Sequence, residues 1–186
     1  MRDPNGEVSD RRELSSIMGE VISQEELLEV REGWKGKKVV FTNGCFDLLH
    51  IGHIHCLREA KKWGDILIVG LNSDLSVRKI KGKERPIVPQ RERAAILASL
   101  EMVDYVCIFD EDTPYRIISF LKPDCIVKGG DWRPEDVVGK DMVEGRGGKV
   151  VTVNIVEEKS TKGLIEKIME RYCPEPDKNP KSFLDR

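Results

Sequence analysis

Three histidines lie within six residues of one another, and they are the residues of this sequence best suited to do chemistry. His50, His53 and His55 are all the histidines of the chain. His50 and His53 are three residues apart and can share one face of a helical turn, while Gly52 between them leaves the backbone open to a ligand. A helix N-terminus offers unpaired N–H groups and a positive dipole end. Two imidazoles at such an end predict a binding site for a polyphosphate.

Two other interpretations of the same residues are open. The histidines could pack at a helix start without any ligand, but this leaves the placement of Gly44 and Gly52 unexplained. They could also bind zinc together with Cys56. However, His55 and Cys56 are expected to point away from the His50–His53 face, and the spacings of zinc fingers are absent. The sequence therefore favours the phosphate site.

The histidines must be positioned by a larger framework, and the chain shows an alternating pattern of elements. Strands are expected at 38–43, 65–71, 105–109, 125–127 and 149–153, with helical patterns before, between and after them. This order predicts an α/β fold, a Rossmann-like doubly wound five-stranded parallel sheet flanked by helices. Ligands bind such sheets at the carboxyl ends of the strands. We expect a loose leader over 1–21, the domain over 22–172 and a flexible Pro-rich tail over 173–186.

Composition limits the class of protein. The chain has 186 residues, of which 39% are hydrophobic and 34% charged, and its net charge is −2. This is too apolar for a disordered chain, and it lacks the basic excess of a non-specific nucleic-acid binder. No apolar run approaches the ~20 residues of a membrane span, and the N-terminus has no signal-peptide pattern. Five scattered cysteines without a CxxC pair favour a reduced, cytoplasmic setting.

A longer motif surrounds the histidines. Residues 41–53 read FTNGCFDLLHIGH, which closely resembles the HxGH signature of the nucleotidyltransferase superfamily in its cytidylyltransferase-like branch. Matching pieces at 72–74 (NSD), 81–87 (KGKERPI) and 127–132 (VKGGDW) extend the resemblance over about residues 22–171. Together they are most similar to the adenylyltransferases that act on D-glycero-β-D-manno-heptose 1-phosphate. The resemblance implies transfer of AMP from ATP to that sugar phosphate by direct in-line attack, with release of pyrophosphate.

The resemblance also implies roles for individual residues. The expected catalytic residues are His50 and His53, which would bind the phosphates, and Lys79 and Lys81, which would close over the triphosphate from a mobile loop. The expected nucleotide-binding residues are Thr42, Asn43, Gly44, Cys45, Phe46, Gly52, Lys128, Gly129, Ser160 and Thr161. The expected acceptor-binding residues are Asp47, Asn72, Asp74, Arg85, Asp131 and Trp132.

Several of these residues have a structural alternative. Asp47 could hold Mg²⁺ or orient the acceptor, or it could cap the following helix. Asp74 could likewise cap its helix, and Trp132 could be buried. Arg91, a weaker candidate for phosphate contact, is expected on exposed helix surface. Asp104 is expected to lock the conformation before the third strand.

The last helix departs from the family pattern, which usually has a Gly, one residue and then Ser-Thr-Thr. Here Glu158 takes the place of the Gly, and Lys162 takes the place of the second Thr. Ile155 and Glu101 take the places of arginines that the related cytidylyltransferases commonly carry. Both changes favour ATP over CTP.

The resemblance further implies Mg²⁺ with ATP, a homodimer, and no nucleic-acid or membrane partner. The chain resembles a stand-alone form that works after a separate heptose kinase. Two alternatives stay open. One is a cytidylyltransferase acting on a polyol phosphate such as glycerol 3-phosphate, and the other is a non-catalytic nucleotide-binding protein of the same fold.

Overall fold

The computed structural model describes residues 19–130, 132–154 and 160–173, and its framework is one parallel sheet. The strands are β1 (Glu20–Ile22), β2 (Val39–Gly44), β3 (Ile66–Asn72), β4 (Tyr105–Phe109), β5 (Cys125–Gly129) and β6 (Lys149–Val153). Their order in the sheet is β1-β4-β3-β2-β5-β6. The strand order reverses between β2 and β5, and this switch point is where sheets of this kind bind ligands.

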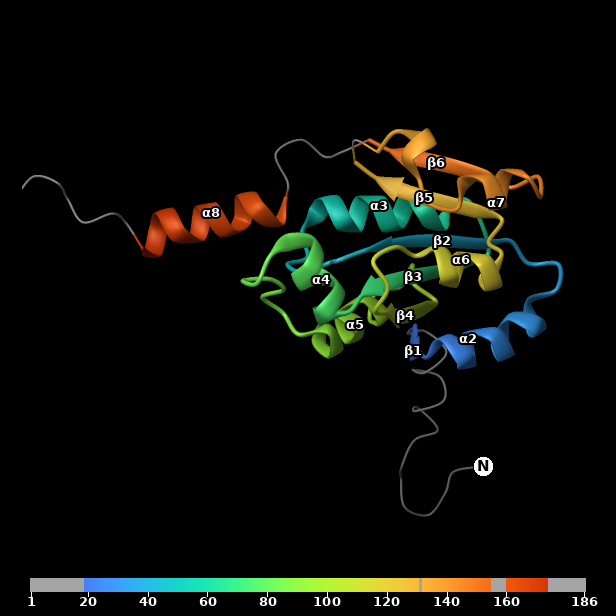
Figure 1. The fold of residues 1–186 in the computed structure, drawn as a ribbon, viewed down its shortest axis with the longest axis horizontal. Coiled ribbons are helices and arrows are strands. Elements are labelled where there is room, and N and C mark those ends of the chain that lie inside the picture. Colours follow the sequence, from blue (N-terminus) through green and yellow to red (C-terminus); the bar gives the residue numbers. More distant parts are fainter. Residues whose placement is uncertain (1–18, 131, 155–159, 174–186) are drawn as a thin grey trace, which may run out of the picture.

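Helices lie on both sides of the sheet (Figure 1). They are α2 (Gln24–Arg31), α3 (Ile51–Lys61), α4 (Asp74–Lys81), α5 (Gln90–Ala98), α6 (Tyr115–Leu121), α7 (Lys140–Glu144) and α8 (Thr161–Tyr172). One hydrophobic cluster joins the sheet to α3 and α5, and the other joins it to α2, α6 and α7. Val40 belongs to the first cluster and Phe41 to the second, because successive strand residues point to opposite faces. None of the described helices is long and apolar enough to span a membrane.

The predicted doubly wound α/β fold is confirmed, with all five predicted strands in place, but the predicted strand count was wrong by one. β1 pairs in parallel with β4 at the sheet edge, through Glu20–Tyr105, Val21–Val106 and Ile22–Cys107. Two of its three residues fall in the segment predicted to be a loose leader. They are exposed, so the strand has no apolar run to reveal it.

Candidate active site

His50 and His53 lie at the start of α3, behind the carboxyl end of β2, and their rings are stacked. The ring centroids are 3.8 Å apart at an interplanar angle of 25°. His50 is the extended N-cap residue of α3, and its carbonyl accepts the N–H of His53 at 2.9 Å. Phe46 contacts His53 with a centroid distance of 5.1 Å. The loop after β2 therefore folds back to hold the histidine pair.

The glycines of this loop make room for that arrangement. Gly44 ends β2, and a Cβ there would come within 3.1 Å of the Phe46 ring. Phe46 itself has a φ of 43°, in the left-handed region that L-residues seldom adopt. Thr42 is buried within β2, and Gly52 lies in the first turn of α3. The predicted residues of the FTNGCFDLLHIGH motif are thus brought together at one edge of the sheet.

Both stacked imidazoles are neutral at neutral pH. Burial lowers the pKa of His50, and burial together with the adjacent His50 lowers the pKa of His53 to about 4. The Nδ1 atoms of both rings are buried and have no hydrogen-bond partner among the residues that the structure describes. A proton on Nε2 leaves each Nδ1 with an unpaired lone pair rather than an unpaired N–H. The pair then offers neutral N–H donors to an anionic oxygen instead of two repelling cations.

The low pKa of His53 predicts a loss of stability in acid. The unfolded chain binds this proton with a pKa of ~6.5, while the folded chain does so only near pH 4. The free energy of unfolding should therefore fall as the pH drops through that window, by about 3 kcal/mol at most. Denaturant titrations across this range should show a flatter pH dependence for His53→Gln. His55→Gln, on the same helix, is the control, and equal slopes for wild type and His53→Gln would contradict the assignment.

The carboxylate of Asp47 accepts hydrogen bonds from groups of the protein itself. Its side chain is fully buried and accepts the N–H groups of Ile87 and Val88 and the Nε–H of Arg85. Burial opposes ionisation, but these donors together hold the pKa of Asp47 below its usual value. The carboxylate thus anchors the segment before α5, and it does not cap α3, whose N-cap residue is His50. Arg85 is engaged in the same anchor.

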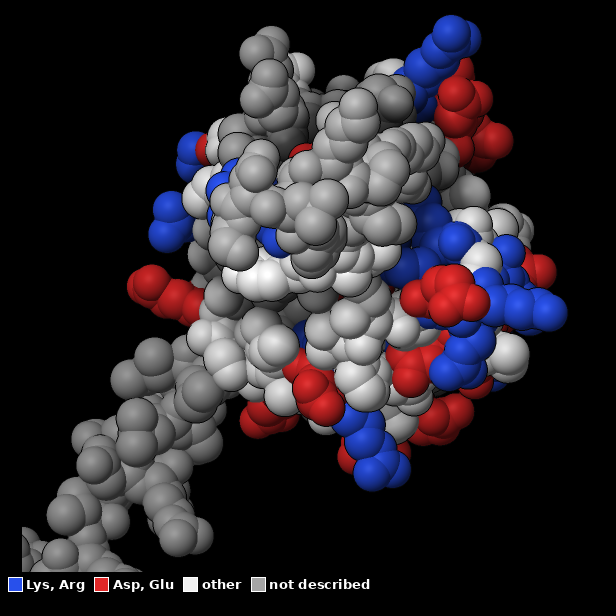
Figure 2. Space-filling model, turned by 90° about the vertical axis from the view of Figure 1, so that its left-hand side faces the viewer, with Lys and Arg blue, Asp and Glu red and all other residues white. Residues whose placement is uncertain are grey.

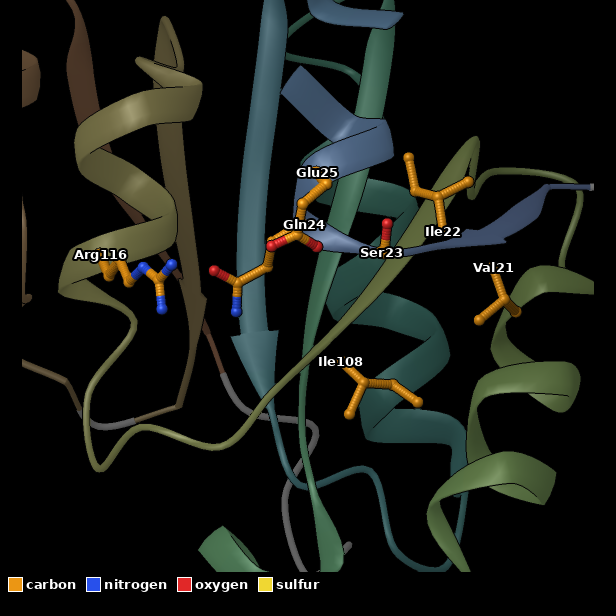
Figure 3. A pocket seen from close by; sticks show the side chains of 7 residues that line it. All are labelled: Val21, Ile22, Ser23, Gln24, Glu25, Ile108 and Arg116. Carbon is orange, nitrogen blue, oxygen red and sulfur yellow. The ribbon is translucent and has the colours of Figure 1, made fainter. Parts of the chain in front are cut away.

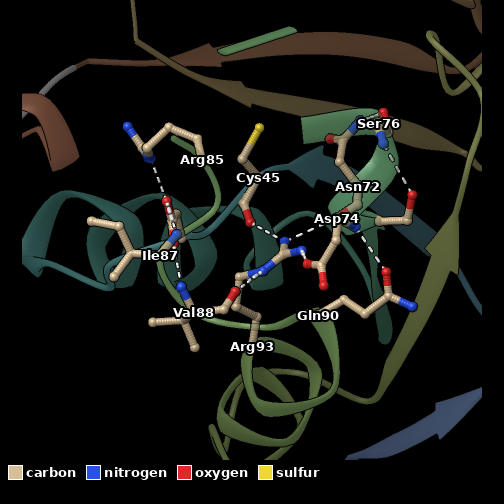
Figure 4. A network of polar contacts seen from close by, with 11 residues as sticks. Cys45, Asn72, Asp74, Ser76, Arg85, Ile87, Val88, Gln90 and Arg93 are labelled. Atoms are coloured by element: carbon tan, nitrogen blue, oxygen red, sulfur yellow. Dashed lines mark hydrogen bonds and ion pairs between the residues drawn. The ribbon is translucent and has the colours of Figure 1, made fainter. Parts of the chain in front are cut away.

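A buried arginine, which is not among the residues predicted from the sequence, joins four segments at this edge (Figure 4). Arg93 of α5 is 1% exposed. Its guanidinium donates to the carbonyls of Val88, Cys45 and Asn72 and to the carboxylate of Asp74. It therefore ties the loop after β2 to the end of β3, the start of α4 and the turn before α5.

Asn72 and Asp74 are part of this scaffold. Asn72 is buried and donates from Nδ2 to Ser76 at 3.0 Å. Asp74 pairs with Arg93 at 2.7 Å, while Ser73, rather than Asp74, caps α4. These two side chains thus hold the loops in place, and their role in binding the acceptor stays a prediction.

The predicted loop lysines lie on the last turn of α4. Lys79 pairs with Asp112 at 3.2 Å, and both side chains are exposed. Burial raises the pKa of the Cys45 thiol, and the positive charge of Lys81 is the largest opposing influence. Lys81 therefore lies toward the loop after β2. Figure 2 shows Lys and Arg side chains gathered on one side of this edge, with acidic side chains among them.

The β5 side of the switch point carries Lys128 and Gly129. Lys128 is 9% exposed and donates from Nζ to Oδ1 of Asn43 at 2.8 Å and to its carbonyl at 3.2 Å. The same Nζ lies 4.9 Å from the ring centroid of Trp132, which is 46% exposed rather than buried. A Cβ at Gly129 would approach Sγ of Cys56 to 2.9 Å, so the close packing of α3 requires glycine there.

The start of α8 contacts the histidine loop. Thr161 donates from Oγ1 to the carbonyl of Leu48 at 3.4 Å, and Ser160 caps the helix by accepting the N–H of Gly163 at 3.0 Å. Asp131, Ile155 and Glu158 lie outside the described residues.

One further sequence expectation is confirmed by the described residues. Asp104 accepts both the Leu67 N–H and the Lys61 ammonium, which confirms its structural role before β4. Within the described part of the chain, no three His, Cys, Asp or Glu side chains are grouped to hold a metal ion.

A pocket of about 420 Å³ lies elsewhere on the sheet edge (Figure 3). It is lined by residues of β1, α2, β4 and α6, namely Val21, Ile22, Ser23, Gln24, Glu25, Ile108 and Arg116. None of the predicted site residues lines it, so it is separate from the histidine site.

The chain belongs to the cytidylyltransferase-like family, whose model matches residues 41–169. This confirms the resemblance seen in the HxGH motif. The chain is 50% identical over 174 residues to the bifunctional protein HldE of Trichlorobacter lovleyi, and the match covers 94% of this chain and 33% of that protein. It is 59% identical over 137 residues to HldE of Geotalea uraniireducens, covering 74% and 28%. The chain thus spans about a third of the length of these curated relatives.

Solved structures agree with the family. The lipopolysaccharide core biosynthesis protein of Thermoplasma volcanium is 32% identical with a TM-score of 0.54, covering 67% of this chain and 100% of that one. Pantoate–β-alanine ligase of Francisella tularensis has a TM-score of 0.55 at 16% identity, covering 73% of this chain and 67% of that one. At that identity the likeness to the ligase shows the fold alone.

Proposed function

We propose that this chain is an adenylyltransferase that moves AMP from ATP to D-glycero-β-D-manno-heptose 1-phosphate, giving ADP-heptose and pyrophosphate. The observation that carries the proposal is the stacked, neutral His50–His53 pair at the N-terminus of α3, beside the β2–β5 switch point. The likeness to a lipopolysaccharide core biosynthesis protein supports a sugar acceptor. The motif resemblance described above supports heptose 1-phosphate and ATP.

The reaction needs neither a protein nucleophile nor a general base, because the attacking phosphate oxygen of the acceptor is already ionised. That oxygen forms a bond to the α-phosphorus while the bond to the pyrophosphate oxygen breaks. The protein then contributes position and stabilisation of developing charge. The imidazole N–H groups of His50 and His53, with the free backbone N–H groups of α3, would bind phosphate oxygens. Lys79 and Lys81 would meet the departing pyrophosphate from α4.

Magnesium is proposed to enter the site with ATP. In nucleotide sites Mg²⁺ binds substrate phosphates and waters with only one or two carboxylates. The oxygens of Asp47 are already bonded to Arg85, Ile87 and Val88, so this carboxylate does not fit a resident ion. When bound, the ion would neutralise phosphate charge.

We propose that the enzyme works in the cytoplasm as a homodimer. All five cysteines are free thiols, as a reducing compartment requires. A kinase reaction would supply the acceptor, since its phosphate must be installed before this step. The dimer is supported by the family resemblance, and sedimentation of the purified chain would test it.

The proposed function is tested by pyrophosphate release with the heptose 1-phosphate, run in Mg²⁺ with ATP, CTP, GTP and UTP separately. With the heptose 1-phosphate as acceptor, we expect turnover with ATP and with none of the other three nucleotides. We expect no turnover when glycerol 3-phosphate replaces the heptose 1-phosphate. Turnover with CTP and glycerol 3-phosphate would place the chain among the polyol-phosphate cytidylyltransferases. ATP binding without release of pyrophosphate from ATP in the presence of either acceptor would contradict the proposed reaction.

A further inference from the structure

Lys128 bridges two strand ends at the switch point. The pairing of β2 with β5 is Val40–Cys125 and Phe41–Ile126, so Asn43 and Lys128 lie two residues beyond the last pair. The Lys128 side chain reaches from the end of β5 to the end of β2 and donates to both oxygens of Asn43. These acceptors are neutral, and so is the Trp132 ring beside the ammonium.

The charge of Lys128 has no counter-anion in the described part of the chain, where none of the ion pairs includes it. Burial lowers its pKa to about 8, and the groups that oppose this are the thiols of Cys56 on α3 and Cys45 in the loop after β2. At the start of α3, His50 and His53 are neutral near that pH because burial lowers their pKa values. The carboxylate of Asp47 in the same loop is paired with Arg85. A buried ammonium without an anion is unfavourable.

A phosphate would remove this imbalance. The histidines on the β2 side offer neutral donors, and buried Arg93 is paired with Asp74. Among the described residues, Lys128 on the β5 side is therefore a buried positive charge at the switch point that has no anionic partner. We propose that Lys128 binds the phosphate chain of the nucleotide and takes up a proton from solvent as the nucleotide binds. This inference rests on the proposed function. The nucleotide phosphate is then the counter-anion of Lys128, while Asn43 holds the ammonium in place in the free protein.

The test is isothermal titration of the full chain with Mg²⁺–ATP, without any acceptor, from about pH 6.5 to about pH 9.5. Titrations near pH 8 in buffers of different ionisation enthalpy count the protons taken up. We expect an uptake of about half a proton per ATP in the wild type at that pH, because the bound phosphate raises the pKa of Lys128. The affinity should fall as the pH rises above about 8.

Three variants separate charge from structure. Lys128→Met should bind ATP about 10- to 100-fold more weakly near neutral pH, as for loss of one charged hydrogen bond, and should show no uptake. Lys128→Arg stays protonated, so its proton uptake should vanish and its affinity should not fall above pH 8. Lys122→Met removes an exposed lysine before β5 and should match the wild type.

Each outcome bears on the proposal. Unchanged affinity in Lys128→Met, or equal proton uptake in wild type and Lys128→Arg, would overturn it. If Lys128→Met does not fold, the wild type and Lys128→Arg still decide through proton uptake. ATP binding with the expected uptake but no turnover with the heptose 1-phosphate would overturn the proposed function and leave the role of Lys128 standing. Absence of ATP binding to the wild type would overturn both.

Discussion

Replacing His53 by alanine is expected to lower kcat for pyrophosphate release by about 10²- to 10³-fold, the effect of losing one transition-state donor. His53 is the more deeply held member of the stacked pair, lying between His50 and Phe46. Its position is set before substrate arrives, so the loss should fall on kcat more than on KM. Steady-state kinetics with ATP and the heptose 1-phosphate measure both constants.

His55→Ala is the matched control, since it makes the same substitution on α3 two residues further along. The His55→Ala variant should keep kcat within a few-fold of the wild type, because His55 lies outside the stacked pair. The electrostatic influence of His55 is on the carboxylate of Glu59, whose pKa it helps to lower. Thermal unfolding of both variants separates a catalytic defect from a folding defect. A His53→Ala enzyme with near wild-type kcat would remove His53 from the catalytic residues.

Replacing Arg93 by alanine is expected to lower the free energy of unfolding by about 3–5 kcal/mol, the range for breaking a buried ion pair from one side. The change leaves the Asp74 carboxylate and three backbone carbonyls without their donor. Arg93→Lys should recover only part of the loss, because an ammonium cannot reproduce the forked geometry of the guanidinium. Urea denaturation of the wild type, Arg93→Ala and Arg93→Lys measures the free energy of unfolding of each protein.

Arg91→Ala is the control for this series. Arg91 lies in the first turn of the same helix but is exposed, as predicted from the sequence, so its removal should change stability by less than about 0.5 kcal/mol. A small loss for Arg93→Ala, comparable to that of Arg91→Ala, would show that the loops hold together without the guanidinium.

The parts of the site that the sequence predicts well are those encoded by local spacing. The distance of three residues between His50 and His53, next to an apolar strand, is enough to place both rings at one helix start. The Ser23–Glu26 capping box at the start of α2 is of the same kind, since both its hydrogen bonds join residues three apart.

Long-range partners are what the sequence conceals. Asp47 and Asp74 have the residue type expected of ligands, yet their partners lie 38 and 19 residues away and are arginines of the same fold. A weak local signal for Arg93 exists, because it falls on the apolar face of α5 with Leu97 one turn later. A charged residue on such a face indicates a buried partner without saying which one.

The anchor formed by Asp47 limits how the basic segment after β3 can move. Its far end is fastened through Ile87 and Val88, and its near end is fastened where Ser73 caps α4. Lys79 and Lys81 sit between these two fixed points, next to Gly82, where φ is 99° and no atom would meet a Cβ. A segment attached at both ends can move in its middle but cannot rotate as a whole about one end. The movement of the two lysines is therefore limited by the attachments at both ends of the segment.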